Sequence, residues 1–167
     1  ALSKTRPDLQ LSGVGDGPLR AMVERHVRQQ NNLKFLGWCP RETVVQQVDE
    51  HDLLILPSAV EAFGTVALEA MARRRLVMVT PVCGINDWPE LAGGLFVMRA
   101  QETPAAALQR LEQLSPARRQ QIVREGERAA RAINEQSLGQ WSQVLRIAAR
   151  QAAHMPKRLP SPTFALL

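Results

Sequence analysis

The sequence is poor in several residue types, and each shortage excludes a class of protein. It has only two cysteines, Cys39 and Cys83, which are too few for a disulfide framework and lack the spacing of a metal site. A reducing, cytoplasmic setting therefore fits best. No apolar run reaches eighteen residues, so we expect no transmembrane helix, and the N-terminal stretch lacks the apolar core of a signal peptide. Aromatic residues make up 4% of the chain, so aliphatic side chains must form most of the core.

The basic residues do not form a pattern typical of nucleic-acid binding. The formal net charge is +5, which is compatible with nucleic acid, an anionic membrane surface or a phosphorylated ligand. However, the arginines are mixed with glutamate and glutamine, and no aromatic residues are interleaved with them for base stacking. We interpret them as solvated helix faces and expect no nucleic-acid partner. The histidines are scattered at His26, His51 and His154, so we expect no metal site either.

Short apolar runs alternate with helical patterns in the first two thirds of the chain. The expected strands lie at residues 9–13, 33–36, 52–58, 76–81 and 93–98. Helices are expected from Pro18, over residues 40–51 and over residues 63–75. Apolar strands separated by helices are typical of a parallel sheet that is buried on both faces. We therefore predict an α/β fold, with a Rossmann-like parallel sheet of about five strands flanked by helices.

The pattern after residue 98 predicts helices alone. Thr103 and Ser115 each precede a proline, and a capping residue followed by proline favours a helix start. Ser137 and Gln140 form a capping box that predicts a third start. We expect one domain over residues 1–153, with its sheet part at about 9–98 and its helical part at about 103–153, followed by a proline-rich tail at 154–167.

Two loops follow predicted strands at the edge where open α/β sheets bind ligands: GVGDGP at residues 13–18 and PSAVEAFGT at residues 57–65. In the second loop, Thr65 is predicted to cap a helix whose free amides suit phosphate, and Gly64 lets a ligand approach the backbone. Glu61 and Glu69 are expected to face the pocket at this helix start from two sides. Carboxylates repel phosphate but accept hydrogen bonds from a vicinal diol. The pocket therefore suits a nucleotide-sugar, which has a diphosphate between two hydroxyl-rich groups.

Each of these features also has a plainer interpretation. Taken alone, the two glutamates could be exposed charges that stabilise a helix N-terminus. GVGDGP is equally compatible with a tight strand-to-helix turn in which Asp16 is a turn residue, and Pro18 stands where a dinucleotide fingerprint needs glycine. Trp38 could border a base or simply pack. The run Arg73–Arg75 most simply complements a helix C-terminus, with contact to lipid phosphate as the second interpretation.

Four ordered segments together resemble a known family. GVGDGP, KFLGWCPRETV, DLLILPSAVEAFGTVALEAMA and VTPVCGIND are similar to the C-terminal half of GT-B retaining glycosyltransferases of the group 1, family-4 type. EAFGTVALE resembles the E-x₇-E motif of these enzymes, and the resemblance covers about residues 9–98. It implies one half of a two-domain enzyme that transfers a sugar from a UDP- or GDP-sugar to a glycan or lipid-linked acceptor, with retention of configuration. It also implies no tightly bound cofactor and no metal.

The resemblance implies donor contacts for selected residues of the two loops, of the helix that follows the second loop and of the segment after the second strand. Glu61, with the backbone of Phe63 and Gly64, would contact the transferred sugar, and the backbone of Thr65 and Val66 would contact the diphosphate. Glu69 would bind the ribose, and the backbone near Gly37 and Trp38 would border the base. Gly15 and Gly17 would lie beside the nucleotide. Glu61 is the expected catalytic-site residue.

The chain departs from the family pattern in four places. The N-terminal acceptor-binding domain is missing from the sequence, and so are the phosphate-binding arginine and lysine that normally come just before this region. Arg73 and Arg74 stand where a small residue and glycine usually end the helix, and Cys83 and Asp87 replace a usual glycine and glutamate. The first two departures lead us to expect weak donor binding, and no catalysis, by this chain alone.

Two further functions stay open at this point. One is a non-catalytic nucleotide-sugar-binding or scaffold domain that acts with a partner. The other is a related GT-B enzyme, such as an epimerase or phosphorylase. For the transferase, we expect a role in polysaccharide or lipopolysaccharide biosynthesis at a cytoplasmic location, with peripheral contact to the inner membrane as an option.

Overall fold

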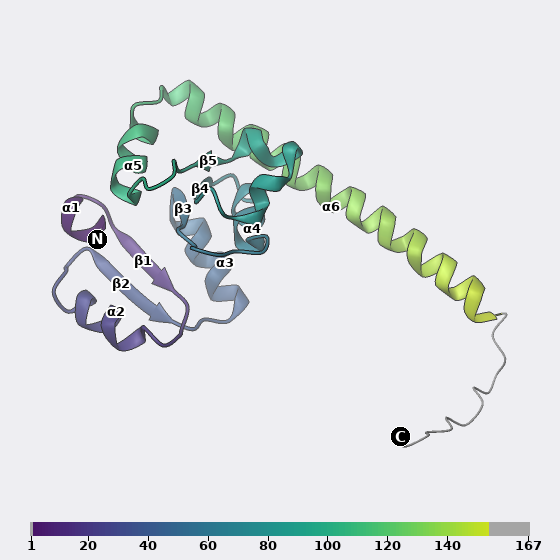
Figure 1. Ribbon diagram of the computed structural model, residues 1–167, viewed down its shortest axis with the longest axis horizontal. Helices are drawn as coiled ribbons and strands as arrows, with labels where there is room; N and C mark the ends of the chain where they lie inside the picture. The colour runs from purple at the N-terminus through teal and green to yellow at the C-terminus, as the bar shows by residue number, and fades with distance from the viewer. Residues whose placement is uncertain (1, 154–167) are drawn as a thin grey trace, which may run out of the picture. The chain divides into compact units, whose positions relative to one another are not determined.

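A computed structural model describes residues 2–153, which form an α/β fold of parallel strands and flanking helices (Figure 1). The predicted fold class is confirmed, including the five parallel strands. The chain divides into two compact units at Arg131, and the predicted tail at 154–167 lies outside the described residues. The elements are α1 (Leu2–Thr5), β1 (Leu11–Val14), α2 (Arg20–Val27), β2 (Leu33–Gly37), α3 (Arg41–Glu50), β3 (Leu53–Leu56), α4 (Thr65–Ala72), β4 (Leu76–Val79), η1 (Gly84–Asp87), η2 (Pro89–Gly94), β5 (Phe96–Val97), α5 (Pro104–Glu112) and α6 (Pro116–Ala153).

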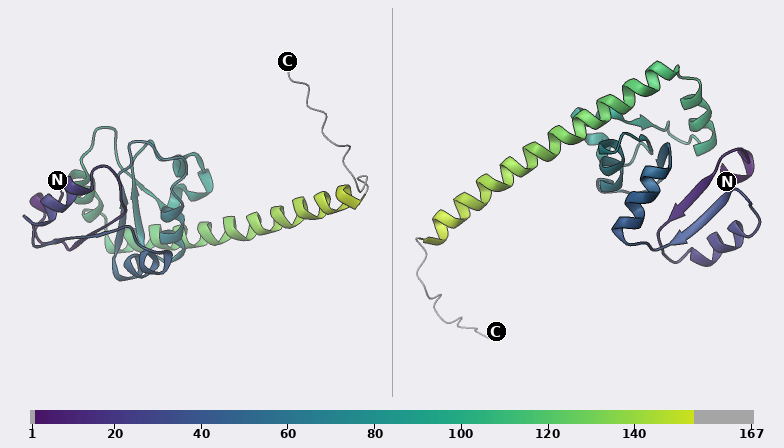
Figure 2. Two further views of the ribbon diagram at one scale, coloured as in Figure 1. Left: turned by 90° about the horizontal axis from the view of Figure 1, so that it is seen from below. Right: turned by 180° about the vertical axis from the view of Figure 1, so that it is seen from behind.

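The strands lie in two sheets rather than in one. β1 pairs with β2 in a parallel register that places Leu11 opposite Leu33. The second sheet has the order β3-β4-β5, and both of its pairings are also parallel. Within residues 2–153, no hydrogen-bonded pairing joins β1 to β3, and the two sheets are separate in Figure 1. α2 lies along β2 in the further views of Figure 2.

The larger sheet is covered on both faces by helices. Met78 of β4 packs with Phe96 and with Leu108 and Leu111 of α5 in one buried cluster. Because successive side chains of a strand point to opposite faces, the buried neighbours of Met78 point the other way, toward α4. α4 is the helix that follows β3, so this packing holds its N-terminus rigidly at the carboxyl end of the sheet.

Two of the predicted helix starts in the C-terminal part are confirmed. Thr103 Oγ1 accepts a hydrogen bond from the Ala106 amide, and Ser115 Oγ accepts one from the Arg118 amide, both at 3.2 Å. The start predicted at Ser137 is wrong, because α6 continues unbroken from Pro116 to Ala153. Good helix formers precede Ser137 and no proline interrupts them, so nothing ends the earlier helix. No helix among residues 2–153 combines the length and apolarity needed to cross a membrane.

Two element boundaries also differ from the prediction. α2 begins at Arg20 rather than at Pro18, because residues 17–19 form a turn in which the Arg20 amide donates to Gly17 O at 3.0 Å. The strand predicted at 93–98 shortens to Phe96–Val97, because Pro89–Gly94 forms a 3-10 helix. A glycine pair carries no side chain that would favour the extended backbone.

The C-terminus of α4 contains a strained residue. Arg74 has φ +60°, and the amides of Arg74 and Arg75 donate to Met71 O and Ala70 O at 3.0 Å each. This is the hydrogen-bond pattern of a Schellman motif, whose left-handed position usually holds glycine. Instead of simply complementing the helix end, Arg74 pairs with Glu127 at 2.9 Å.

Arg74→Gly is therefore expected to stabilise the protein. Relief of the left-handed backbone is worth about 1–2 kcal/mol, and the lost exposed ion pair removes about 0.2–1 kcal/mol of that gain. Arg74→Ala is the matched control, because it removes the ion pair and keeps the strain. Urea unfolding measures both variants. A glycine variant no more stable than the alanine variant would show that the backbone is not strained.

Asn32 ties the N-terminal segment to the start of β2. It is 8% exposed, and its Nδ2 donates to Arg6 O and Leu9 O at 3.0 Å and to Ser3 O at 3.3 Å. Asn32→Ala leaves these carbonyls without their partner, so we expect the free energy of unfolding to fall by about 1–3 kcal/mol. The exposed neighbour Asn31 provides the control, since Asn31→Ala should change stability by less than about 0.5 kcal/mol. Equal losses in the two variants would contradict this account.

Candidate functional site

The loop after β3 enters α4 through a left-handed glycine. Gly64 has φ +89° and is the N-cap of the helix, so the cap predicted at Thr65 is wrong by one residue. A left-handed backbone is easy for glycine and costly for threonine, which explains the shift. A Cβ on Gly64 would lie 3.0 Å from Leu56 Cδ2 and 3.1 Å from Cys83 Sγ. The loop backbone is therefore held tightly against the end of β3 and the loop after β4.

The first turn of α4 presents unused hydrogen-bond donors. The Ala67 amide donates to Gly64 O at 2.8 Å, whereas the amides of Thr65 and Val66 reach no acceptor within the described residues. Thr65 is exposed and Val66 is partly exposed. Free amides at the positive end of a helix dipole are a favourable place for an anion such as a phosphate.

Glu61 lies where the loops after β3 and β4 meet. It forms a parallel bridge with Cys83, and its carbonyl accepts a hydrogen bond from the Gly84 amide at 2.9 Å. Asn86 Nδ2 holds the second loop by donating to Thr80 O at 2.9 Å and to Cys83 O at 2.8 Å. The partly exposed Glu61 carboxylate makes no hydrogen bond or ion pair with any residue between 2 and 153. Its backbone is fixed and its side chain is free to accept hydrogen bonds.

Glu69 has a partner that the sequence did not suggest. Arg41 Nη2 lies 3.3 Å from Glu69 Oε1, and the two side chains are 77% and 31% exposed. Arg41 is the first residue of α3, directly after the loop that follows β2. The pair therefore links the end of the first sheet to α4 of the second. A basic residue just after a strand's carboxyl end is the signal that could have identified Arg41.

The loop after β1 is joined to the end of β2 at two glycines. The Gly15 amide donates to Gly37 O at 2.8 Å, and both glycines have positive φ, +132° and +68°. Asp16 acts as a turn residue, as predicted. Hydrogen bonds from the Gly17 amide and from Arg20 hold the pKa of Asp16 below its usual value. Arg20 was not predicted, and its guanidinium covers Gly37, 3.5 Å from where a Cβ would stand.

The aromatic residues of the predicted site differ in their surroundings. Phe63 packs edge-on against Trp88, with ring centroids 5.7 Å apart and an interplanar angle of 79°. Trp38 is 72% exposed, so its ring does not pack in the core. An exposed tryptophan beside Gly37 is available for contact with a flat apolar group such as a nucleobase.

The structure thus joins the predicted residues in three groups rather than in one closed cavity. Glu61, Phe63 and Gly64 lie with Cys83 and Gly84. Glu69 lies with Arg41, and Gly15 lies with Gly37. Cys83, Gly84, Asn86, Arg20 and Arg41 are the residues of the site that the sequence did not assign. Together the groups offer free amides, one unpaired carboxylate and one paired carboxylate, at loops that follow parallel strands.

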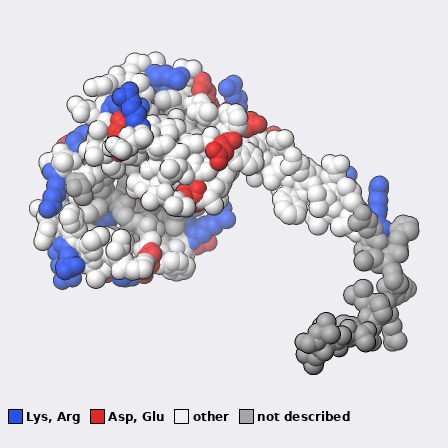
Figure 3. Space-filling model, in the orientation of Figure 1, with Lys and Arg blue, Asp and Glu red and all other residues white. Residues whose placement is uncertain are grey.

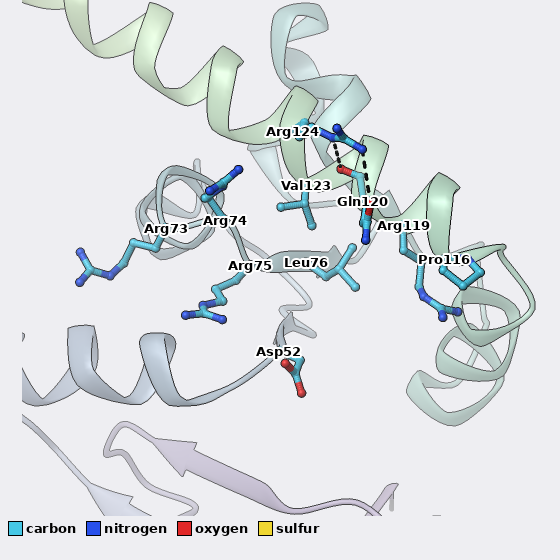
Figure 4. A pocket seen from close by; sticks show the side chains of 10 residues that line it. All are labelled: Asp52, Arg73, Arg74, Arg75, Leu76, Pro116, Arg119, Gln120, Val123 and Arg124. Carbon is cyan, nitrogen blue, oxygen red and sulfur yellow. Dashed lines mark hydrogen bonds between the residues drawn. The ribbon is translucent and has the colours of Figure 1, made fainter.

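A separate pocket of about 740 Å³ is lined by five arginines, from the turn before β4 and from the start of α6 (Figure 4). The guanidinium groups do not converge on one point in Figure 4. Arg73 is paired with Asp49, Arg74 with Glu127, and Arg119 with backbone carbonyls. Basic and acidic side chains are also interspersed on the face drawn in Figure 3. We therefore do not assign this pocket as the functional site.

A family model described as glycosyl transferases group 1 matches residues 1–115. Among curated proteins, the phosphatidylinositol N-acetylglucosaminyltransferase GPI3 subunit of Saccharomyces cerevisiae is 32% identical over 105 residues, which cover 60% of this chain and 22% of that protein. The alpha-D-kanosaminyltransferase of Streptomyces kanamyceticus is 30% identical over 115 residues, or 66% of this chain and 30% of that enzyme. The chain therefore spans less than a third of the length of these relatives.

Solved structures show the same fold. Sucrose-phosphate synthase from Thermosynechococcus elongatus matches 88% of this chain and 42% of its own, with a TM-score of 0.64 and 25% identity. HepE from Anabaena, in a complex with UDP and glucose, matches 85% of this chain and 44% of its own, with a TM-score of 0.64 and 21% identity.

Proposed function

Because the chain belongs to the group 1 glycosyltransferase family, we propose that it is the nucleotide-sugar-binding domain of a GT-B glycosyltransferase. The whole enzyme transfers a sugar from a nucleotide-diphosphate sugar to a glycan or lipid-linked acceptor. The acceptor binds in a cleft that needs a second Rossmann-like domain. Separate domains for the donor and the acceptor agree with a chain that spans less than a third of the length of its curated relatives.

One observation carries the proposal most directly. The unpaired carboxylate of Glu61 and the free amides of Thr65 and Val66 lie on the two sides of Gly64, in a loop held by the segment at Cys83. The amides bind the diphosphate, and the carboxylate accepts hydrogen bonds from the hydroxyls of the sugar that is transferred. A diphosphate and a polyol next to each other satisfy both groups at once.

The remaining contacts place the nucleoside. Glu69 binds the ribose diol, and Arg41 orients the Glu69 carboxylate. The backbone near Gly37 and Trp38 borders the base, and Gly15 and Gly17 leave room for it because no side chain projects there. Gly15 and Gly17 are open in the structure, since a Cβ on either would meet no atom within 4 Å.

The chemical role of Glu61 in this proposal is electrostatic and positional. It holds the sugar so that the acceptor attacks the anomeric carbon while the helix amides stabilise the charge that develops on the leaving diphosphate. We also propose that the transfer retains the configuration at the anomeric carbon of the sugar. UDP is the first donor nucleotide to test, because the HepE structure contains UDP; GDP is the second. The name of the yeast relative makes a lipid-linked acceptor a reasonable first choice.

The test is an assay of the full-length protein for release of free nucleotide from UDP- and GDP-sugars, with and without glycan or lipid-linked acceptors. The proposal expects release that depends on an acceptor, a product whose anomeric configuration by NMR matches the donor, and loss of turnover in Glu61→Ala. Nucleotide release without an acceptor, together with an altered free sugar, would indicate an epimerase instead. Binding without any turnover would indicate a scaffold domain.

A further inference from the structure

A side-chain hydrogen bond joins the loops after β3 and β4 three residues before Glu61. Thr80 directly follows β4, and its Oγ1 donates to Ser58 O at 2.7 Å, a favourable distance for a hydroxyl donor. Both residues are partly buried. The backbone pairing of the two strands ends at Leu56 and Val79, so the threonine hydroxyl continues the connection past the end of the sheet.

Two further bonds join the same loops at Glu61 and just after it. The Gly84 amide donates to Glu61 O at 2.9 Å, and Cys83 Sγ donates to Phe63 O at 3.4 Å. The loop after β4 therefore holds carbonyl groups on both sides of Glu61 as well as that of Glu61 itself. Because the backbone is held at all three places, the loop after β4 sets the direction in which the Glu61 side chain leaves it.

Asn86 makes the loop after β4 a rigid support. Its Nδ2 bridges Thr80 O and Cys83 O at 2.9 and 2.8 Å, and its backbone amide also donates to Cys83 O, at 3.0 Å. The preceding residue, Ile85, is fully buried. The loop is therefore closed on itself by Asn86 and anchored in the core by Ile85, and a functional side chain is held most precisely by residues that are themselves fixed.

We propose that Thr80 is a positioning residue for sugar transfer, with Asn86 in support. The Thr80 hydroxyl fixes the backbone that carries Glu61, and thereby the place of the Glu61 carboxylate, without contact to the donor. The inference rests on the proposed function, in which this carboxylate holds the transferred sugar. A displacement of about 1 Å in a group that orients a substrate can lower the rate by about 100-fold, so a single lost hydrogen bond here affects turnover.

The nucleotide end of the site is held in a different way. α4 packs against β4 through Ala67, Ala70 and Met71, each of which is at most 1% exposed. This apolar packing does not involve the Thr80 hydroxyl, so the amides at the start of α4 keep their place when that hydroxyl is removed. Turnover and nucleotide affinity therefore respond separately to a change at Thr80.

The test compares Thr80→Val with Thr80→Ser in the full-length protein. Valine keeps the shape of threonine without its hydroxyl, whereas serine keeps the hydroxyl. We expect Thr80→Val to lower kcat about 10- to 100-fold, while the Kd for UDP by calorimetry, or for GDP if that is the donor nucleotide, stays within about twofold of the parent value. The Gly84 amide should exchange its hydrogen faster in Thr80→Val, because its bond to Glu61 O opens more often. Thr80→Ser should keep the parent exchange rate and most of kcat.

Asn86→Ala provides a second variant, and we expect the same three changes as in Thr80→Val. Unchanged exchange of the Gly84 amide in both variants would overturn the inference, because the side chains would not hold the loops together. A loss of nucleotide affinity as large as the loss of kcat would also overturn it, since the whole site would then be disturbed.

The inference and the proposed function fail in different ways. Turnover that is lost in Glu61→Ala but kept in Thr80→Val and Asn86→Ala would overturn the positioning role alone. A parent protein without any turnover would overturn the proposed function, and the positioning role with it.

Discussion

Gly84→Ala is expected to disrupt the candidate site and to destabilise the protein by about 2–4 kcal/mol. A Cβ at this position would lie 1.9 Å from Ala62 O and 2.7 Å from Ala62 C, so backbone has to move before the side chain fits. The displacement also breaks the bond from the Gly84 amide to Glu61 O at 2.9 Å. Forced overpacking costs about 1–3 kcal/mol, and the lost hydrogen bond adds about 1 kcal/mol.

Denaturant unfolding of Gly84→Ala should be compared with Gly139→Ala. Gly139 lies in α6, and a Cβ there would meet no atom within 4 Å. Alanine in a helix interior is favoured over glycine, so the control should gain about 0.5–1 kcal/mol. A Gly84→Ala protein with unchanged stability and unchanged nucleotide binding would mean that the loops after β3 and β4 are not in contact as described.

Glu69→Ala is expected to weaken nucleotide binding about 10- to 100-fold while leaving the fold intact. The carboxylate is partly exposed and its pair with Arg41 is open to solvent, so its loss costs little stability. A charge-assisted hydrogen bond to a ligand is worth about 1.5–3 kcal/mol, which corresponds to this range of affinity. Calorimetric titration of the full-length protein with UDP or GDP measures the change.

Arg41→Ala and Glu42→Ala separate a specific effect from general electrostatics. Arg41→Ala should weaken binding by less than Glu69→Ala, because it only releases the carboxylate that binds the ribose. Glu42 is an exposed acidic residue beside Arg41 in the first turn of α3, and Glu42→Ala should leave affinity within about twofold of the parent protein. Tighter binding in Glu69→Ala would mean that the carboxylate repels the diphosphate rather than holding the ribose.

Local patterns in the sequence predicted the helices and strands of this fold better than they predicted which strands pair. The apolar run LLIL and the cap at Thr103 depend on neighbouring residues, and both are confirmed. The division into two sheets could not be predicted, because strand pairing is set by residues far apart in sequence. Ser137 shows that a local pattern can also mislead, because a capping pattern starts a new helix only where the preceding helix has ended, and α6 continues through Ser137.

The sequence predicted residues for the candidate site but not the contacts that hold these residues in place. Glu61, Gly64 and Glu69 follow a recognisable spacing along one loop and one helix. The residues that hold them, such as Cys83 against Gly64 and Arg41 beside Glu69, come from other segments. Gly84 is a clear example, since only the structure shows that Ala62 O occupies the place of its side chain.

The most direct test of the donor site is an NMR titration of the full-length protein with UDP, followed by GDP. If the account is correct, the amides of Thr65 and Val66 shift most, with further shifts at Gly15 and Gly37, and the Glu69→Ala variant needs at least tenfold more nucleotide for the same shifts. The amides of Arg75, Arg119 and Arg124 should not move. Shifts confined to those three arginines, or none at saturating nucleotide, would contradict a donor site at the start of α4.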